Sequence, residues 1–273
     1  MTRLVHFAER SVAVTYGDTV SVYEKGKAIT KFGTNSTVGT TYETVAQLQS
    51  TESNETFVTT NIIDSIVSSS ASDTTQTITI EGHTIDGSGN LTFVVQDAVL
   101  TGQTEVTLTT PLARANRMVV KRTGTFGSTP TALVGTVSVY DNTAGITAGV
   151  PNTAAATKIV LRAGFAQSNK CQTAISSSDY WFVDEFTAGV GNSGGSANRV
   201  TFKLEKRDIA NGGPWLPVGG EIVVVVGQNG AQFKFEPLAI IPKNHDVRVS
   251  AKTNANTAEV FAEISGYLAK IVS

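Results

Sequence analysis

Short runs in which apolar residues alternate with threonine or another polar residue are the feature that most restricts how this chain can fold. The clearest of these runs are 62–67, 76–83, 91–95 and 105–108. Alternation at period two gives a strand one buried face and one solvated face. Turn-forming residues at 86–90 and 101–104 separate the later runs. We therefore expect residues 51–120 to form a domain that is an antiparallel β-meander.

Strand candidates continue at regular spacing through the second half of the chain. They are 136–140, 158–161, 180–183, 199–204, 221–226, 233–235, 247–249 and 259–268. Short strands separated in this way by turn residues are typical of β-sandwiches and jelly rolls. We expect residues 121–273 to form a second domain of this kind. The predicted fold class is all-β, with two β-sandwich or jelly-roll-like domains and little helix, for which 41–49 is the best candidate.

The first 50 residues contain short apolar stretches that single glycines interrupt. Residues 11–14 and 19–23 are strand candidates, and each is too short to bury much surface alone. We interpret residues 1–50 as an extended N-terminal arm that becomes ordered by lying on another surface. Two edge strands of the following domain are an equally good interpretation of the same residues.

Composition restricts the partners of the chain. It has 21 Lys and Arg against 23 Asp and Glu, a formal charge of −2, so it has no basic excess for a phosphate backbone. The longest clean apolar run, 222–226, is far shorter than the roughly 20 residues that span a bilayer. Residues 1–20 carry charges and no continuous apolar core, unlike a signal peptide. We expect neither nucleic acid nor membrane as a partner.

Catalytic motifs are weak in this sequence. Residues 191–195, Gly-Asn-Ser-Gly-Gly, differ by one residue from the Gly-Asp-Ser-Gly-Gly around the nucleophile of chymotrypsin-like proteases. That mechanism also needs a histidine base supported by a carboxylate, and His6, His83 and His245 do not stand in the protease context. A flexible loop explains the same residues, and the lone Cys171 is expected to be an inert thiol.

Metal and sugar sites are equally weak. His83 and His245 each lie near a carboxylate residue but lack the spacing of paired histidine ligands. Residues 86–90 resemble the first half of a calcium loop without its later glutamate, so a plain turn is the better interpretation. Trp181 and Trp215 are expected to be core or interface anchors rather than a sugar-stacking platform. We therefore assign no catalytic, metal-binding or cofactor-binding residue and expect no cofactor.

Two groups of segments resemble virion structural proteins of tailed bacteriophages, in particular phages that infect cyanobacteria and other aquatic hosts. The segments are 76–83, 100–104 and 109–117 in the middle of the chain, and 236–249 and 262–269 near its end. The resemblance implies a β-sandwich protein that is not an enzyme and is present in many copies on the particle. It implies a cement or decoration protein that bridges neighbouring capsid subunits, or a component of the neck or tail.

The resemblance also implies the partners, which are the major capsid protein and further copies of this chain, most simply as a trimer. The protein would be made in the host cytoplasm and end on the capsid surface of the virion. A tail module that binds host glycans through Trp181 and Trp215 is the alternative, and a serine hydrolase using Ser193 is a third hypothesis. The residues that we expect at interfaces are Leu4, Phe7, Val12, Val14, Val20, Val22, Tyr23, Phe32, Tyr42, Trp215, Val247, Val249 and Tyr267.

Overall fold

A computed structural model shows that the chain is built almost entirely from β-strands, which confirms the predicted fold class. It describes residues 11–16, 19–49, 57–121, 132–193, 197, 199–209, 213–228 and 230–272. The helical content of these residues is two short 3-10 turns, η1 (Asn142–Ala144) and η2 (Ala154–Ala156). Among them, no helix has the length and apolar character needed to cross a membrane.

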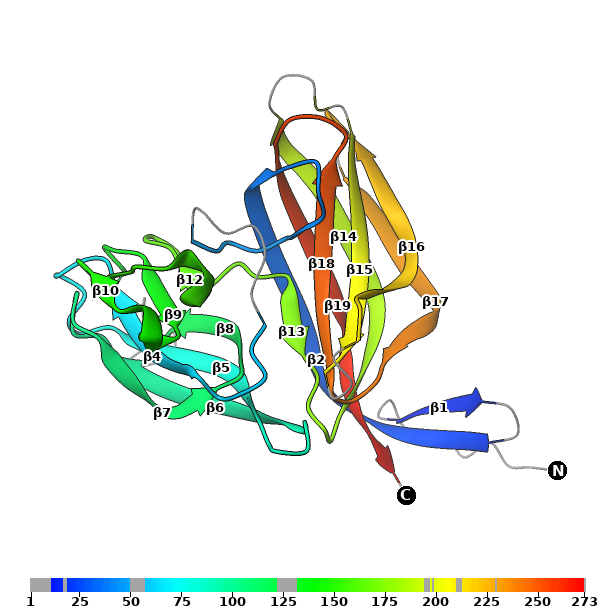
Figure 1. Cartoon of the computed structure of the whole chain (residues 1–273). Coiled ribbons are helices and arrows are strands. Elements are labelled where there is room, and N and C mark those ends of the chain that lie inside the picture. The colour runs from blue at the N-terminus through cyan, green and yellow to red at the C-terminus, as the bar shows by residue number, and fades with distance from the viewer. Residues whose placement is uncertain are drawn as a thin grey trace.

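The larger of two bodies is a sandwich of two antiparallel sheets (Figure 1). Sheet A has, in spatial order, β1 (Ser11–Tyr16), β2 (Thr19–Val38), β19 (Ala258–Val272), β14 (Tyr180–Ser193) and β17 (Ala231–Ile241). Sheet B has β13 (Gln172–Ala174), β18 (His245–Thr253), β15 (Arg199–Asp208) and β16 (Leu216–Val225), with β3 (Glu43–Thr44) paired to β18. The core between them contains Trp181, Phe186 and Phe202, all at most 1% exposed. The inward-facing apolar side chains of both sheets fill this core.

The smaller body packs two further sheets against each other. Sheet C has, in order, β12 (Thr157–Leu161), β9 (Val137–Tyr140), β4 (Ile63–Ser68) and β7 (Val106–Leu112). Sheet D has β6 (Leu91–Val99), β5 (Thr77–Ile85) and β8 (Arg114–Val120), and β10 (Ile146–Thr147) pairs with β11 (Val150–Pro151) in a hairpin. Ile66, Ile80 and Met118 are fully buried in the separate core of this body.

Strand pairing in the smaller body differs from the expected meander. β5 and β6 form the predicted hairpin, and the side chain of Asp86 accepts hydrogen bonds from the backbone N–H groups of Ser88 and Asn90 at 2.8 Å in its turn. β4, however, pairs with β7 and β9, and β5 pairs with β8 on its other edge. Period-two alternation fixes the buried face of a strand but not its neighbours, which is why the meander was not the outcome.

The domain boundary also lies later in the chain than residue 120. β9 and β12, which we expected in the second domain, complete sheet C by pairing with β4 and with each other. After β2 and β3, the next strand of the sandwich is β13, and all strands from β13 to β19 belong to it. β4 is buried along its length and sits inside its sheet, so it needs a partner on each edge, and β7 can supply only one.

Much of the expected N-terminal arm is part of the sandwich. β2 pairs with β19 from Val38↔Ala258 to Val22↔Val272, while β1 pairs only with residues 19–24, so among the described strands residues 25–38 form an edge of sheet A within the sandwich. Only the β1–β2 hairpin projects beyond the sandwich, close to the end of β19 (Figure 1). Gly33 permits the close packing of β2, because a Cβ there would lie 2.1 Å from the carbonyl oxygen of Val45.

Residues 41–49, the best candidate for a helix, are not helical. They contain β3, and the N–H of Val45 donates to the carbonyl oxygen of Val249 at 2.9 Å. The N–H of Cys171 in turn donates to the carbonyl oxygen of Val45 at 3.0 Å. These backbone groups complete the edge of sheet B, and a helix would have withdrawn them from it.

A buried ion pair joins the two bodies. Arg114 of β8 donates from Nε and Nη2 to the two carboxylate oxygens of Asp246 of β18, at 2.7 and 3.0 Å. Arg207 of β15 donates to the same carboxylate at 2.7 Å, and Asp246 is fully buried. A second link comes from the side chain of Asn244, which accepts from the N–H of Leu91 at 3.0 Å.

Replacement of Asp246 by alanine is expected to lower the free energy of unfolding by about 3–5 kcal/mol, because two guanidinium groups lose their shared buried carboxylate. Urea unfolding followed by far-ultraviolet circular dichroism measures the change. The matched control is Asp97→Ala, which removes an ion pair with Lys121 between side chains that are 38% and 49% exposed. The control should cost about 1 kcal/mol or less. Equal losses in the two variants would contradict the role given to Asp246.

Candidate functional site

The β16 edge is the strand at the border of sheet B, and its second half, residues 222–225, is apolar. Among the described residues, β15 is its hydrogen-bonded neighbour, and β16 stands at the end of the sheet order. Leu216, Val223 and Val225 are 52%, 51% and 46% exposed. Residues 222–226 carry no charge that would oppose pairing with another strand. A strand edge of this kind is a template for β-pairing with a partner chain.

The outer face of sheet B carries cations stacked on aromatic rings. The guanidinium groups of Arg248 and Arg207 lie 4.1 and 5.0 Å from the ring centroid of Trp215. Arg207 also lies 4.2 Å from the ring centroid of Phe57. Further along the face, the amines of Lys203 and Lys252 lie 4.1 and 4.5 Å from the ring of Tyr42. Lys203 and Arg248 also pair with Glu221 and Glu205 at 3.0 and 2.9 Å, so the outer face of sheet B is aromatic and carries more cations than carboxylates, and we call it the basic face.

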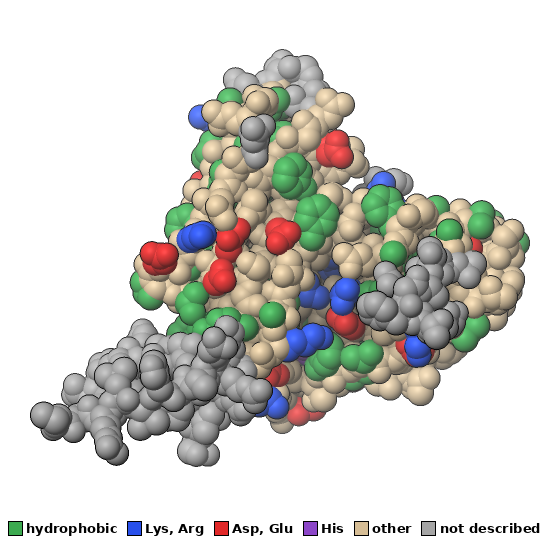
Figure 2. All heavy atoms as spheres, turned by 180° about the vertical axis from the view of Figure 1, so that it is seen from behind, with side chains coloured by type: hydrophobic (Ala, Val, Ile, Leu, Met, Phe, Trp, Pro, Cys, Tyr) green, Lys and Arg blue, Asp and Glu red, His purple; other side chains and the backbone are tan. Residues whose placement is uncertain are grey.

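The outer face of sheet A has the opposite charge. Phe32 and Phe261 are each 36% exposed there, and the Phe261 ring lies across Gly189, where a Cβ would meet the ring at 2.1 Å. The acidic residues on the same face are Asp184, Glu185, Glu259 and Glu263. Figure 2 shows acidic side chains gathered around exposed apolar rings on this side of the sandwich. The sandwich therefore presents an acidic face and a basic face on its two sides.

Three of the predicted interface residues are buried. Val247 and Val249 of β18 are fully buried in the sandwich core. Tyr267 is 8% exposed, and its ring stacks on Phe182 with 5.3 Å between centroids. These positions are corrections: β18 is an inner strand of sheet B whose apolar side chains the two sheets already cover, and Tyr267 of β19 is covered in a separate cluster with Phe182 and Ala269.

Three other predicted interface residues lie on the two outer faces. Phe32 is on the acidic face, and Tyr42 and Trp215 are half-buried on the basic face. The hydroxyl of Tyr42 donates to Glu221 at 3.3 Å. All three retain apolar surface that a partner can cover.

The remaining predicted interface residues belong to the N-terminal segment. Leu4 and Phe7 lie outside the described residues. The backbones of Val12, Val14, Val20, Val22 and Tyr23 lie in the β1–β2 hairpin, with Val12 opposite Tyr23 and Ala13 opposite Val22. These residues share the part of sheet A that projects beyond the sandwich.

The residues of the serine hydrolase hypothesis are far apart in the fold. Ser193 ends β14 and pairs with Ala258, at the end of the sandwich where β18 finishes. His245 begins β18 at the opposite end, and His83 belongs to the smaller body. His6 lies outside the described residues. The geometry therefore brings neither described histidine to Ser193.

The candidates for a reactive thiol, a sugar-binding ring and a metal site are not supported by their surroundings. Cys171 is fully buried, and burial raises the pKa of its thiol. Trp181 is fully buried in the sandwich core and offers no ring face to a sugar. In the described part of the chain, no group of three or more His, Cys, Asp or Glu side chains is placed to hold a metal ion.

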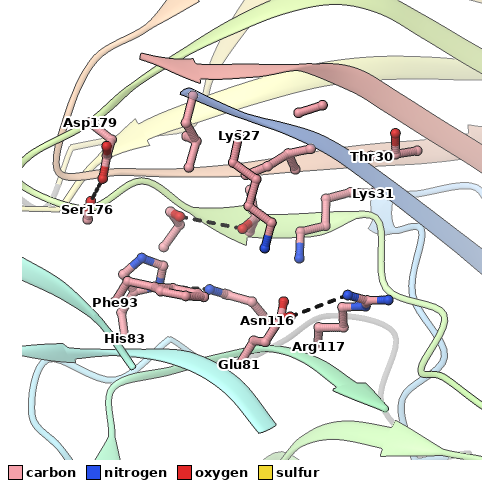
Figure 3. A pocket seen from close by; sticks show the side chains of 15 residues that line it. Lys27, Thr30, Lys31, Glu81, His83, Phe93, Asn116, Arg117, Ser176 and Asp179 are labelled. Atoms are coloured by element: carbon pink, nitrogen blue, oxygen red, sulfur yellow. Dashed lines mark hydrogen bonds and ion pairs between the residues drawn. The ribbon is translucent and has the colours of Figure 1, made fainter. Parts of the chain in front are cut away.

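A cleft between the two bodies contains the titratable groups that sequence analysis did not connect (Figure 3). Strands β2 and β13 of the sandwich form one wall, and β5, β6 and β8 of the smaller body form the other. In the wall formed by the smaller body, the amide nitrogen of Asn116 donates to Nδ1 of His83 at 2.8 Å. Burial, and next the charge of Lys31, lowers the pKa of His83 to about 4, so its imidazole is neutral at pH 7.

Comparisons with known proteins give little further information. No family model matches the chain, and a search among curated proteins gives no match. A structure of infectious bursal disease virus Gt strain is similar with 11% identity and a TM-score of 0.23, over 95% of this chain and 75% of that one. A structure of the Gx strain gives 12% identity and a TM-score of 0.14, over 96% and 84%. At these scores the likeness carries no argument about this chain.

Acid is expected to weaken the fold through His83. The unfolded histidine takes up its proton near pH 6.5 and the folded one only near pH 4, so stability is lost as the pH falls through this window. Between pH 7 and pH 5 the contribution is about 2 kcal/mol of unfolding free energy. Urea unfolding of the wild type and His83→Gln at both pH values measures it. The same loss in both proteins would show that His83 has no part in the pH dependence.

Proposed function

We propose that this chain is a non-enzymatic structural protein of a tailed-bacteriophage virion, which bridges neighbouring capsid subunits as a cement or decoration protein on the head surface. The observation that carries this proposal is the β16 edge, whose second half, residues 222–225, is apolar and uncharged and has Val223 and Val225 exposed on its outer side. The resemblance of residues 76–83 and 236–249 to virion proteins supports the same assignment. Its partners are the major capsid protein and further copies of the chain.

The proposed contact works by strand addition. A partner strand laid along β16 would satisfy the outward backbone groups of that edge and cover its exposed valines at the same time. Each square ångström of apolar surface covered contributes about 25 cal/mol, and stable contacts bury about 1,600 Å² in total. Many such contacts around a shell would have to break together before the head could rupture.

The two outer faces suggest how copies of the chain would meet. Contact of the acidic face of one copy with the basic face of the next is heterologous, and such contacts form a closed ring when the rotation between copies closes. A threefold ring, which is the expected trimer, is the smallest ring of this kind. Contacts between like faces would instead bring carboxylates such as Glu259 and Glu263 together.

The glycan-binding alternative loses the residues on which it depended. Trp181 is buried, and Arg207, Arg248 and Phe57 surround the Trp215 ring. A sugar would need an open ring face on which to stack. For this reason we keep the structural role as the proposed function.

Charge placed on the β16 edge is expected to remove the protein from the particle. Val223→Lys and Val225→Lys should each lower the copy number per virion at least about tenfold, because a buried lysine opposes strand addition. The measurement is quantitative mass spectrometry of purified particles assembled with each variant.

The matched control is Val134→Lys, at a valine of the smaller body that is 64% exposed. All three variants should unfold at the wild-type temperature, since exposed substitutions change stability by about 0.5 kcal/mol or less. Unchanged copy numbers for the β16 variants, or losses no larger than in the control, would disprove strand addition at this edge.

The projecting hairpin is expected to contribute a second contact. Deletion of residues 1–18 removes β1 but leaves β2 paired with β19, so the sandwich should remain folded. The copy number on virions is expected to fall several-fold, by the same mass spectrometric measurement. Wild-type occupancy of the truncated protein would mean that the N-terminal segment does not contact the shell.

A further inference from the structure

Two cavities between the bodies meet at the same residues. One has a volume of about 210 Å³ and the other of about 520 Å³. Both are lined by Thr30 and Lys31 of β2 and by Asn116 and Arg117 of β8. The cleft is thus built by strands of both bodies, which β2 and β8 bring together from distant parts of the sequence.

The side chain of Lys31 is a largely buried cation in this cleft. Lys31 is 8% exposed, and no hydrogen bond or ion pair of its Nζ is found among the described residues. Figure 3 shows its side chain directed from β2 toward the smaller body, as is that of Lys27. A buried amine that lacks a partner is costly, unless a ligand or water supplies one.

The surroundings of Lys31 favour an anion. Nη1 of Arg117 pairs with Glu81 at 3.3 Å and Nη2 donates to Gln167 at 2.9 Å, so this guanidinium is held at the wall of both cavities. Nζ of Lys170, which lines the second cavity, donates to two backbone carbonyls at 2.8 and 2.9 Å. The charged residues that line the two cavities are Lys27, Lys31, Glu81, Arg117, Lys170, Asp179 and Glu263. Cations therefore exceed carboxylates in the cleft.

We propose that the cleft binds a small oxyanion, a phosphate or a carboxylate, between Nζ of Lys31 and the guanidinium of Arg117. The amide of Asn116, whose nitrogen already donates to His83, has a second hydrogen to donate to the anion. Because Lys31 belongs to the sandwich and Arg117 to the smaller body, the bound anion would fasten the two bodies together.

Binding of this anion would be linked to a proton. Burial lowers the pKa of Lys31 to about 8, against the attraction of Glu81 and with the repulsion of Arg117 and Lys170. An anion beside the amine raises that pKa again, so at pH 8 binding takes up a proton. The affinity should therefore decrease as the pH rises through 8.

Isothermal titration calorimetry of the full chain with inorganic phosphate and, in a separate arm, with citrate tests the proposal. We expect one site per chain, and titration at pH 8 in two buffers of different ionisation enthalpy should show proton uptake. Tighter binding of phosphate would identify a phosphate site, and tighter binding of citrate a carboxylate site. Failure of both anions to bind below about 10 mM would overturn the proposal.

Two substitutions locate the site. Lys31→Met should weaken binding at least about tenfold and abolish the proton uptake, whereas the matched control Lys234→Met, at an exposed lysine of β17 that lines neither cavity, should bind as the wild type does. Arg117→Gln is the second variant in the site and should also weaken binding at least about tenfold. Thermal unfolding without the anion shows whether each variant is folded. Wild-type affinity in folded Lys31→Met and Arg117→Gln would overturn the proposal.

Discussion

The carboxylate of Asp246 fixes how the two bodies of this protein are placed. It is fully buried and receives hydrogen bonds from Arg114 of the smaller body and from Arg207 of the sandwich. A buried ion pair adds little net stability compared with apolar packing, since desolvation offsets most of the attraction. What it adds is geometry, because the two oxygens of one carboxylate accept from a bidentate guanidinium in a single arrangement. We infer that Asp246 determines the orientation of the bodies more than the strength of their association.

That orientation has consequences at both sides of the junction. On one side, the same arginine that contacts Asp246 joins the row of stacked cations and rings, since Arg114 lies 5.1 Å from Phe57 and Phe57 lies 5.4 Å from Trp215. On the other side, β8 is held opposite β2, which creates the cleft around Lys31. A single buried interaction thus supports the basic face of sheet B and the walls of the interdomain cavities.

Sequence analysis located the strands better than their partners. Every strand candidate from residue 136 onward coincides with a strand or part of one, because apolar alternation depends only on neighbours in sequence. The pairing of β4 with β9 joins residues about 70 positions apart, and nothing in local alternation encodes it. The long β2 was missed for a related reason. Glycines at 26 and 33 interrupt its apolar pattern, yet Gly33 is where β2 packs most closely against Val45.

The candidate sites show the same difference between what local sequence indicates and what the topology decides. The run 222–226 was visible as the longest apolar stretch, although only the sheet order shows that it lies on an edge. Val247 and Val249 alternate with polar residues on β18, which lies inside the sheet, and both valines are buried. No local sequence pattern pointed to Lys31 or Arg117 as site residues, because they come together only where the two bodies meet. Sequence can indicate which residues prefer to be covered, and the topology decides whether the chain itself covers them.

The same reasoning separates the two kinds of surface that remain exposed. Pairing through β16 is directed by backbone hydrogen bonds, which any strand with a free edge can make, so it demands little of the partner's side chains. Contact through the acidic and basic faces depends on matched charges, and another copy of this chain supplies them because every copy carries both faces. The proposed division of labour follows from this difference in specificity. The edge suits a subunit of the shell that differs in sequence, and the faces suit sister copies around a closed ring.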